Sequence, residues 1–288
     1  MMSRRSLVWL AALAPLAAAC SPLGALNGIN RLAPGDGGVR RRVAGAAYGP
    51  DSRQRLDVWA PAGAAAGPLP VVLFLYGGSW NSGSREGYGF AARALAARGL
   101  VVVVPDYRLV PQVRWPAFVE DGAAALNWVA AHIAGHGGDP ARIAVMGHSA
   151  GAHIALLLAL DRRWGVATRI RAAVGLAGPY DFLPFTPGGV ADAALGNAAD
   201  PADTQPIHFA RGDAPPLLLL HGAGDTTVLP RNSSRLANAI TDLGGRAEAR
   251  LYPDIGHIGI LLALSKPFRG KAPVLADASN FLLKTLGP

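Results

Sequence analysis

The sequence contains very little cysteine, and the chemistry that cysteine supplies is missing with it. Cys20 is the only cysteine among 288 residues, which excludes an intrachain disulfide framework. The patterns HExxH and CxxC and tight clusters of carboxylates are absent from the sequence as well. We therefore expect neither a metal ion nor another cofactor.

The sequence also lacks a concentrated basic segment. It carries 27 Lys and Arg against 19 Asp and Glu, a formal net charge of +8, but the basic residues are scattered, with internal runs only at 40–42 and 162–163. Nucleic-acid-binding proteins gather basic residues on one face with interleaved aromatic residues. We therefore expect no nucleic-acid partner. Hydrophobic residues make up 51%, which is enough for a sizeable core in one large domain.

The N-terminus, MMSRRSLVWLAALAPLAAAC, is typical of an export signal. Arg4 and Arg5 precede a short apolar stretch, residues 6–19, that ends in small residues and is too short for a membrane-spanning helix. Small residues before a lone cysteine resemble a bacterial lipobox, which implies cleavage before Cys20 and lipidation of its thiol. A plainly cleaved, secreted protein and an uncleaved anchor are the alternatives.

This pattern predicts three segments. Residues 1–19 would be a signal peptide, residues 20–42 a lipidated N-terminus and a flexible tether rich in Gly, Pro and Asn, and residues 43–288 one folded domain. If the lipobox resemblance holds, Ser21 favours the outer membrane over the inner one. The expected location is thus the periplasmic face of a membrane, with secretion as the second choice.

Apolar runs alternate with helical segments from about residue 43 onward. The runs at 70–76 and 100–105 are rich in β-branched residues, as in strands that are buried on both faces of a parallel sheet. Further strands are expected at 56–60, 142–147, 172–177, 216–222 and 247–252, and helices at 88–99, 116–134, 149–160, 231–244 and 273–286. The alternation predicts an α/β fold with a mostly parallel sheet and helices on both faces. The long irregular segment 178–214 is typical of a lid or pocket wall.

The motif GHSAG at 147–151 has the form G-x-S-x-G between a predicted strand and a predicted helix. In that context the pattern indicates a nucleophile elbow, a sharp turn that exposes the hydroxyl of Ser149 above the sheet. Side chains at 147 or 151 would collide with neighbouring backbone, so the turn needs both glycines. The alternative is an ordinary strand–helix turn with an N-cap serine.

A serine nucleophile needs a base that is held by a third group. In this type of fold the chain order is Ser, acid, His. Asp225 follows the predicted strand 216–222, and His257 lies in the loop after the strand 247–252, so both are expected where ligands bind in open α/β sheets. The competing acids are Asp254, Asp200, Asp203 and Asp213. His148, His153 and His221 are expected to pack or to support the site.

The stretch YGGSW at 76–80 follows another predicted strand, and its glycines indicate a close approach to the backbone. The chain after them satisfies neither a P-loop nor a dinucleotide fingerprint, which removes phosphate as the ligand. An oxyanion is then the remaining candidate ligand. Acyl transfer needs backbone N–H donors in two places, at the residue after the nucleophile, which is Ala150, and in the loop after the third strand. A tight turn with an aromatic plug is the alternative.

With these motifs in this order, the chain resembles the α/β-hydrolases over roughly residues 43–286. It is most similar to the esterase branch with HGGxW, which includes carboxylesterases, acyl-sugar esterases and kynurenine formamidases. The stretches PDYRL, GGDPARI and PPLLLLHGAGDTTV, at 105–109, 137–143 and 215–228, are also similar to that branch. The resemblance implies that the N–H groups of Gly78 and Ser79 serve the oxyanion hole. Tyr76 stands where that branch has His.

The resemblance implies an α/β-hydrolase fold with a short cap or none, and a serine esterase with the triad Ser149, His257 and Asp225 acting on a small-molecule carboxylic ester without a cofactor. One alternative is an arylformamidase on the same triad. Another is a non-catalytic, surface-tethered binding protein. Residues 178–214 and the region of Trp80, Tyr107 and Trp115 are expected to shape the pocket.

Overall fold

The structure, a computed structural model, describes residues 28, 36–63, 65–166 and 168–287. The predicted signal peptide, Cys20 and most of the predicted tether therefore lie outside the described residues. Among the helices that are described, none is both long and apolar enough to cross a membrane.

An eight-stranded sheet forms the centre of the fold, in the order β1-β2-β4-β3-β5-β6-β7-β8. The edge strand β1 pairs antiparallel with β2, β2 runs antiparallel to β4, and all other neighbours are parallel. The strands are β1 Val39–Ala47, β2 Arg55–Pro61, β3 Leu69–Leu75, β4 Val101–Pro105, β5 Gly138–His148, β6 Ile170–Leu176, β7 Leu217–Gly222 and β8 Ala247–Tyr252. The predicted mostly parallel sheet is confirmed.

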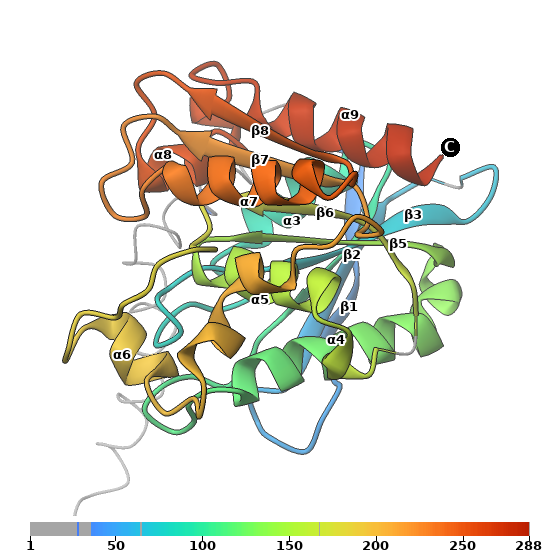
Figure 1. The fold of residues 1–288 in the computed structure, drawn as a ribbon. Coiled ribbons are helices and arrows are strands. Elements are labelled where there is room, and N and C mark those ends of the chain that lie inside the picture. Colours follow the sequence, from blue (N-terminus) through green and yellow to red (C-terminus); the bar gives the residue numbers. More distant parts are fainter. Residues whose placement is uncertain (1–27, 29–35, 64, 167, 288) are drawn as a thin grey trace, which may run out of the picture.

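Helices cover both faces of the sheet (Figure 1). They are α3 Gly89–Ala96, α4 Ala117–His132, α5 Ala150–Leu160, α6 Val190–Leu195, α7 Arg231–Asp242, α8 His257–Leu262 and α9 Val274–Leu286. Helices α3 and α9 pack together on one face, and α4 packs beside α5 on the other, where α7 also lies. All residues of β4 and α5 are buried between these layers, because both are almost wholly apolar.

The folded domain begins earlier than the predicted boundary at 43. Strand β1 starts at Val39, inside the predicted tether 20–42, and Asp36 already forms an ion pair with Arg269. The sequence VRRRVAGAA did not predict this strand, because it lacks an apolar pattern. Such a sequence can form β1 because this strand lies at the edge of the sheet, where arginines can point into solvent. The connection from β6 to β7 holds only the short helix α6 and two 3₁₀ turns.

Candidate active site

Ser149 occupies a sharp turn between β5 and α5. Its backbone has φ 52° and ψ −123°, a left-handed conformation that is strained for any residue other than glycine. A Cβ at Gly147 would collide with the backbone of Gly151, and a Cβ at Gly151 would collide with the carbonyl oxygen of Leu75. The predicted need for both glycines is therefore confirmed, and the serine is raised above the end of the sheet.

The structure brings Ser149, His257 and Asp225 into one hydrogen-bonded chain. The Oγ of Ser149 lies 2.9 Å from Nε2 of His257, and Nδ1 of His257 lies 2.8 Å from Oδ2 of Asp225. His257 is the first residue of the short helix α8, whereas the sequence predicted a loop there. The three side chains have the order and spacing of a nucleophile, a base and an orienting acid.

Asp225 is held from both sides of its carboxylate and is 2% exposed. Its Oδ1 accepts hydrogen bonds from the backbone N–H groups of Thr227 and Val228, each at 2.9 Å. Its Oδ2 faces His257. The competing acid Asp254 is exposed, and within the described residues no hydrogen bond joins it to His257.

His221 supports this carboxylate, as expected from its place before the Asp225 loop. Its Nδ1 lies 2.8 Å from the hydroxyl of Ser233, and its Nε2 lies 2.9 Å from the carbonyl oxygen of Val228 and 3.2 Å from Oδ2 of Asp225. Burial lowers the pKa of His221, so the ring is neutral near pH 7. A neutral ring with its proton on Nε2 satisfies all three contacts.

The loop after β3 carries unoccupied backbone donors next to the serine. Gly78, Ser79 and Trp80 all have positive φ, at 134°, 52° and 57°. Within the described residues, no protein group accepts a hydrogen bond from the N–H of Gly78, Ser79 or Ala150. Ser79 and Ala150 line the same cleft as Ser149, whereas Gly78 does not line it.

Tyr76, which departs from the pattern of the resembling esterases, braces this loop from below the surface. Its ring stacks on that of Tyr107 at 4.6 Å, and its hydroxyl accepts a hydrogen bond of 2.8 Å from Arg53. Arg53 also donates to the carbonyl oxygens of Gly83 and Tyr107. The Tyr76 hydroxyl is thus engaged with Arg53.

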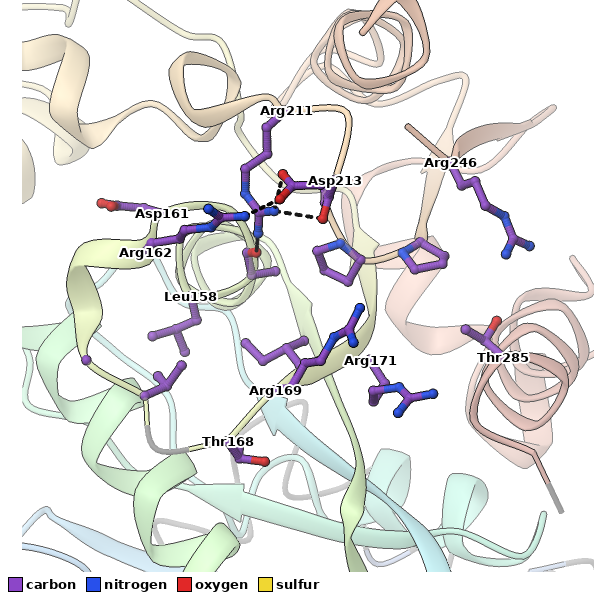
Figure 2. A pocket seen from close by; sticks show the side chains of 17 residues that line it. Leu158, Asp161, Arg162, Thr168, Arg169, Arg171, Arg211, Asp213, Arg246 and Thr285 are labelled. Carbon is purple, nitrogen blue, oxygen red and sulfur yellow. Dashed lines mark hydrogen bonds and ion pairs between the residues drawn. The ribbon is translucent and has the colours of Figure 1, made fainter. Parts of the chain in front are cut away.

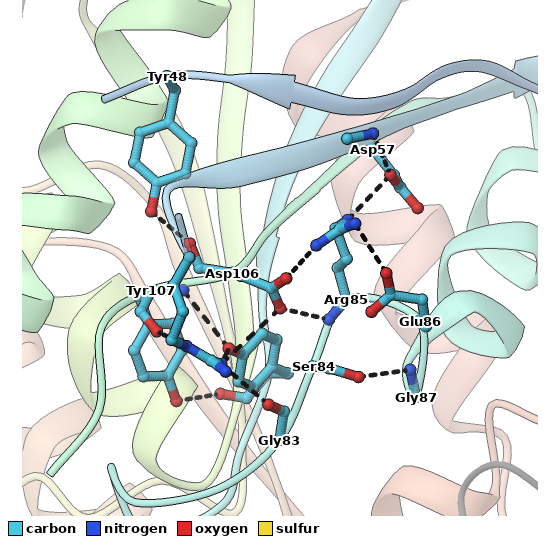
Figure 3. A network of polar contacts seen from close by, with 12 residues as sticks. Tyr48, Asp57, Gly83, Ser84, Arg85, Glu86, Gly87, Asp106 and Tyr107 are labelled. Carbon is cyan, nitrogen blue, oxygen red and sulfur yellow. Dashed lines mark hydrogen bonds and ion pairs between the residues drawn. The ribbon is translucent and has the colours of Figure 1, made fainter. Parts of the chain in front are cut away.

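Charged residues extend this brace to the antiparallel edge of the sheet (Figure 3). Arg85 forms ion pairs with Asp57 in β2, with Glu86 and with Asp106, which follows β4. Asp106 also accepts the backbone N–H of Arg85 at 2.7 Å, and burial raises the pKa of Asp106. The network fixes the segment that leads from the glycine loop into α3.

A second chain of hydrogen bonds links the glycine loop to the candidate base. The N–H of Gly77 donates to the hydroxyl of Tyr88 at 3.2 Å, and that hydroxyl lies 3.3 Å from Nδ1 of His148. Nε2 of His148 lies 3.1 Å from the carbonyl oxygen of His257. Burial lowers the pKa of His148 to about 3, so the neutral ring can accept at Nδ1 and donate from Nε2. The sequence did not point to Tyr88, because no sequence pattern marks a contact between residues that are 60 positions apart.

An apolar cleft of about 380 Å³ leads to the serine. Trp80 lines this cleft, and its ring stacks on that of Phe182 with the centroids 6.4 Å apart. The cleft is lined by Ser79, Trp80, Ser149, Ala150, Pro179, Phe182, Leu183, Pro184, Val190, Ala191, Thr227, Val228, Leu229, Arg231 and Asn232. The predicted wall from 178–214 is thus present, but Tyr107 and Trp115 do not line this cleft.

A larger hollow of about 710 Å³ lies at the other end of the sheet (Figure 2). Arg169 and Arg246, which line it, directly precede β6 and β8, so the hollow opens at the amino ends of parallel strands. Arg162 and Arg211 in its wall pair with Asp213. Among the described residues that line it, no nucleophilic side chain has an adjacent base. In the described part of the chain, no group of three or more His, Cys, Asp or Glu is placed to hold a metal ion.

Known protein families, proteins and solved structures are similar to this chain in sequence and in fold. A sequence model of the family described as BD-FAE matches residues 56–240, a range that includes Ser149 and Asp225 and ends before His257. The chain is similar to esterase LipC of Mycobacterium tuberculosis (strain ATCC 25618 / H37Rv), with 36% identity over 219 residues that cover 68% of this chain and 53% of LipC.

The probable isoprenylcysteine alpha-carbonyl methylesterase ICMEL1 of Arabidopsis thaliana is 31% identical over 259 residues, 81% of this chain and 53% of that protein. The chain spans about half the length of these curated relatives. Among solved structures, the carboxylesterase EstE1 from a metagenomic library has a TM-score of 0.75 and 25% identity, covering 91% of this chain and 96% of that chain. Esterase B from Lactobacillus Rhamnosis (HN001) has the same TM-score at 21% identity, covering 95% of this chain and 96% of its own, a likeness of fold alone. The fold class predicted from the sequence is confirmed.

Proposed function

Since this chain belongs to the BD-FAE family of α/β-hydrolases, we propose that it is a serine hydrolase that cleaves carboxylic esters through an acyl-enzyme. The observation that carries the proposal is the hydrogen-bonded chain from Ser149 through His257 to Asp225, beside free backbone N–H groups. The names of the relatives, esterases and a methylesterase, support the same reaction class.

In the first half of the reaction, Ser149 Oγ attacks the ester carbonyl carbon while Nε2 of His257 takes the hydroxyl proton. Asp225 keeps the His257 proton on Nδ1 and stabilises the imidazolium that forms. The tetrahedral intermediate then collapses, the C–O bond to the alcohol breaks, and the alcohol leaves with the proton from Nε2. Ser149 is left acylated.

In the second half, water takes the place of the alcohol. His257 removes a proton from the water as its oxygen attacks the acyl carbon, and the second tetrahedral intermediate releases the carboxylic acid as Ser149 recovers its proton. In both halves the carbonyl oxygen becomes an oxyanion. As the sequence predicted, the N–H groups of Gly78, Ser79 and Ala150 would donate to it, and each such donor contributes about 10²–10³ in rate.

The test is hydrolysis of p-nitrophenyl acetate by the wild type and by variants. Ser149→Ala and His257→Ala should each lower kcat by more than about 10³-fold, and the double variant should be no worse than either single one, because the residues act as a unit. Ser52→Ala, which changes an exposed serine between β1 and β2, is the matched control. Additive losses, or wild-type activity in Ser149→Ala, would refute the assignment. Adding N-formylkynurenine to the panel separates an esterase from an arylformamidase.

The proposal extends to location. The signal-like N-terminus and the lone cysteine support export, cleavage before Cys20 and attachment of the protein to a membrane by a lipid on its thiol. The substrate would then be a small ester in the periplasmic space or at a membrane surface. Cys20→Ser should release the activity from the membrane fraction or leave an unprocessed precursor, and unchanged fractionation together with an unchanged mass would contradict the proposal.

A further inference from the structure

Exposed hydrophobic side chains gather at the mouth of the cleft. Leu183, Val190 and Leu229 are exposed by 37%, 56% and 40%, and all three line the cleft that holds Ser149. Ile258, exposed by 54%, directly follows His257. Single exposed hydrophobic residues need no explanation, but a contiguous apolar patch beside a cleft indicates that something apolar binds there.

Further apolar side chains line the same cleft, among them Trp80, Pro179, Phe182 and Val228. Arg231 is the one charged residue among the cleft-lining residues of the described chain. An apolar group attached to the reacting carbonyl would therefore meet mostly apolar side chains in this cleft.

We propose that Leu183, Val190 and Leu229, the apolar rim, bind the far end of an apolar chain carried by the substrate. The proposed substrates are esters whose aliphatic chain is longer than the cleft. This inference rests on the proposed ester hydrolysis. Each methylene that leaves water on this surface strengthens binding by about fourfold. The aliphatic chain of the substrate can reach the rim, because the rim residues and Ser149 line one cleft.

The protein itself offers a matched control residue for the apolar rim. Leu229 and Leu243 flank the same helix, α7, and are both exposed, by 40% and 57%. Leu229 lines the cleft at the start of the helix, whereas Leu243 lies at the opposite end and does not line it. Replacing either by asparagine removes a similar apolar surface, so only position relative to the cleft differs.

The experiment compares kcat/KM for monomeric p-nitrophenyl acetate and octanoate, below the concentration at which the octanoate ester aggregates. In Leu229→Asn and in Val190→Thr, the octanoate-to-acetate ratio should fall, by about tenfold for Leu229→Asn, which corresponds to about 1.4 kcal/mol. In Leu243→Asn the ratio should stay within twofold of the wild type. A second series, acetate esters of hexanol and ethanol, shows whether the rim binds the acyl or the alcohol chain, and a ratio lowered in either series supports the proposal.

Three results would overturn it. One is an unchanged ratio in both series, and another is an equal loss in Leu243→Asn. The third is a ratio that changes only when the substrate is dispersed in vesicles, which would make the rim a contact for lipid surfaces. These outcomes are distinct from failure of the proposed function, because that failure would abolish Ser149-dependent hydrolysis of acetate in the wild type itself.

Discussion

The protein should be more stable with glycine at position 149 than with alanine there, although both substitutions of Ser149 abolish turnover. The backbone at this position has φ 52° and ψ −123°, which glycine adopts freely and every other residue adopts under strain. Alanine and glycine both remove the hydroxyl and its hydrogen bond to His257. The comparison between the two variants therefore isolates the cost of a Cβ in this conformation.

The expected difference follows from two opposing contributions to the free energy of unfolding. Relief of a strained backbone conformation contributes about 1–3 kcal/mol. Glycine in place of alanine raises the conformational entropy of the unfolded chain, which costs about 0.4–1 kcal/mol. The glycine variant should thus exceed the alanine variant by about 1 kcal/mol, or about 2–4 °C in Tm for a chain near this size.

Urea unfolding followed by circular dichroism, with thermal melts in parallel, measures this difference. Ser234, inside helix α7, is the matched control, because there glycine should be less stable than alanine by about 1 kcal/mol. If Ser149→Gly proved less stable than Ser149→Ala by a similar amount, the turn would not be strained, and the nucleophile-elbow geometry would be wrong.

Three further predictions concern the acid, the buried histidines and the N-terminus. Asp225→Asn should lower kcat by about 10⁴-fold with the fold intact, whereas Asp254→Asn should stay within a few-fold in the same ester assay; the reverse order would reassign the acid. Burial lowers the pKa of His148 to about 3 and of His153 to about 4, so below pH 6.5 the unfolded chain binds more protons than the folded one. The free energy of unfolding should therefore fall by about 4 kcal/mol from pH 7.5 to pH 5, and a urea titration that shows less than about 1 kcal/mol would contradict neutral rings in the fold. Cys20→Ser should leave an unprocessed precursor or a protein of lower mass without its lipid, as measured by intact mass spectrometry, and an identical mature mass would remove the lipid attachment.

The strands and the candidate triad could be predicted from the sequence because their signals are local. The apolar runs that form β3 and β4 can fit only a sheet that is covered on both faces, and the glycines at 147 and 151 report a steric need within one turn. Asp225 and His257 could be predicted because each follows a predicted strand and because they stand in the order Ser, acid, His. The carboxyl ends of parallel strands meet at one edge of the sheet, so no further sequence signal is needed to bring the two side chains together.

The misplaced boundary and the missed contacts have a different origin. Strand β1 carries three consecutive arginines followed by mostly small residues, and it lies at an edge, where the sheet does not require an apolar pattern. The contacts of Tyr76 with Arg53 and of Tyr88 with His148 join residues that are 23 and 60 positions apart. Such contacts depend on tertiary packing, which overrides what each short stretch prefers, and they decide how the glycine loop is held.

The most direct test of the central claim is covalent labelling of the serine by a fluorophosphonate probe. The reagent reacts with a serine that is activated by a neighbouring base and reports that activation without any assumption about the substrate. We predict one adduct per chain in the wild type, mapped by peptide mass spectrometry to Ser149, and strongly reduced labelling in His257→Ala. An adduct on another residue, or equal labelling of wild type and Ser149→Ala, would contradict the proposal that Ser149 is the nucleophile.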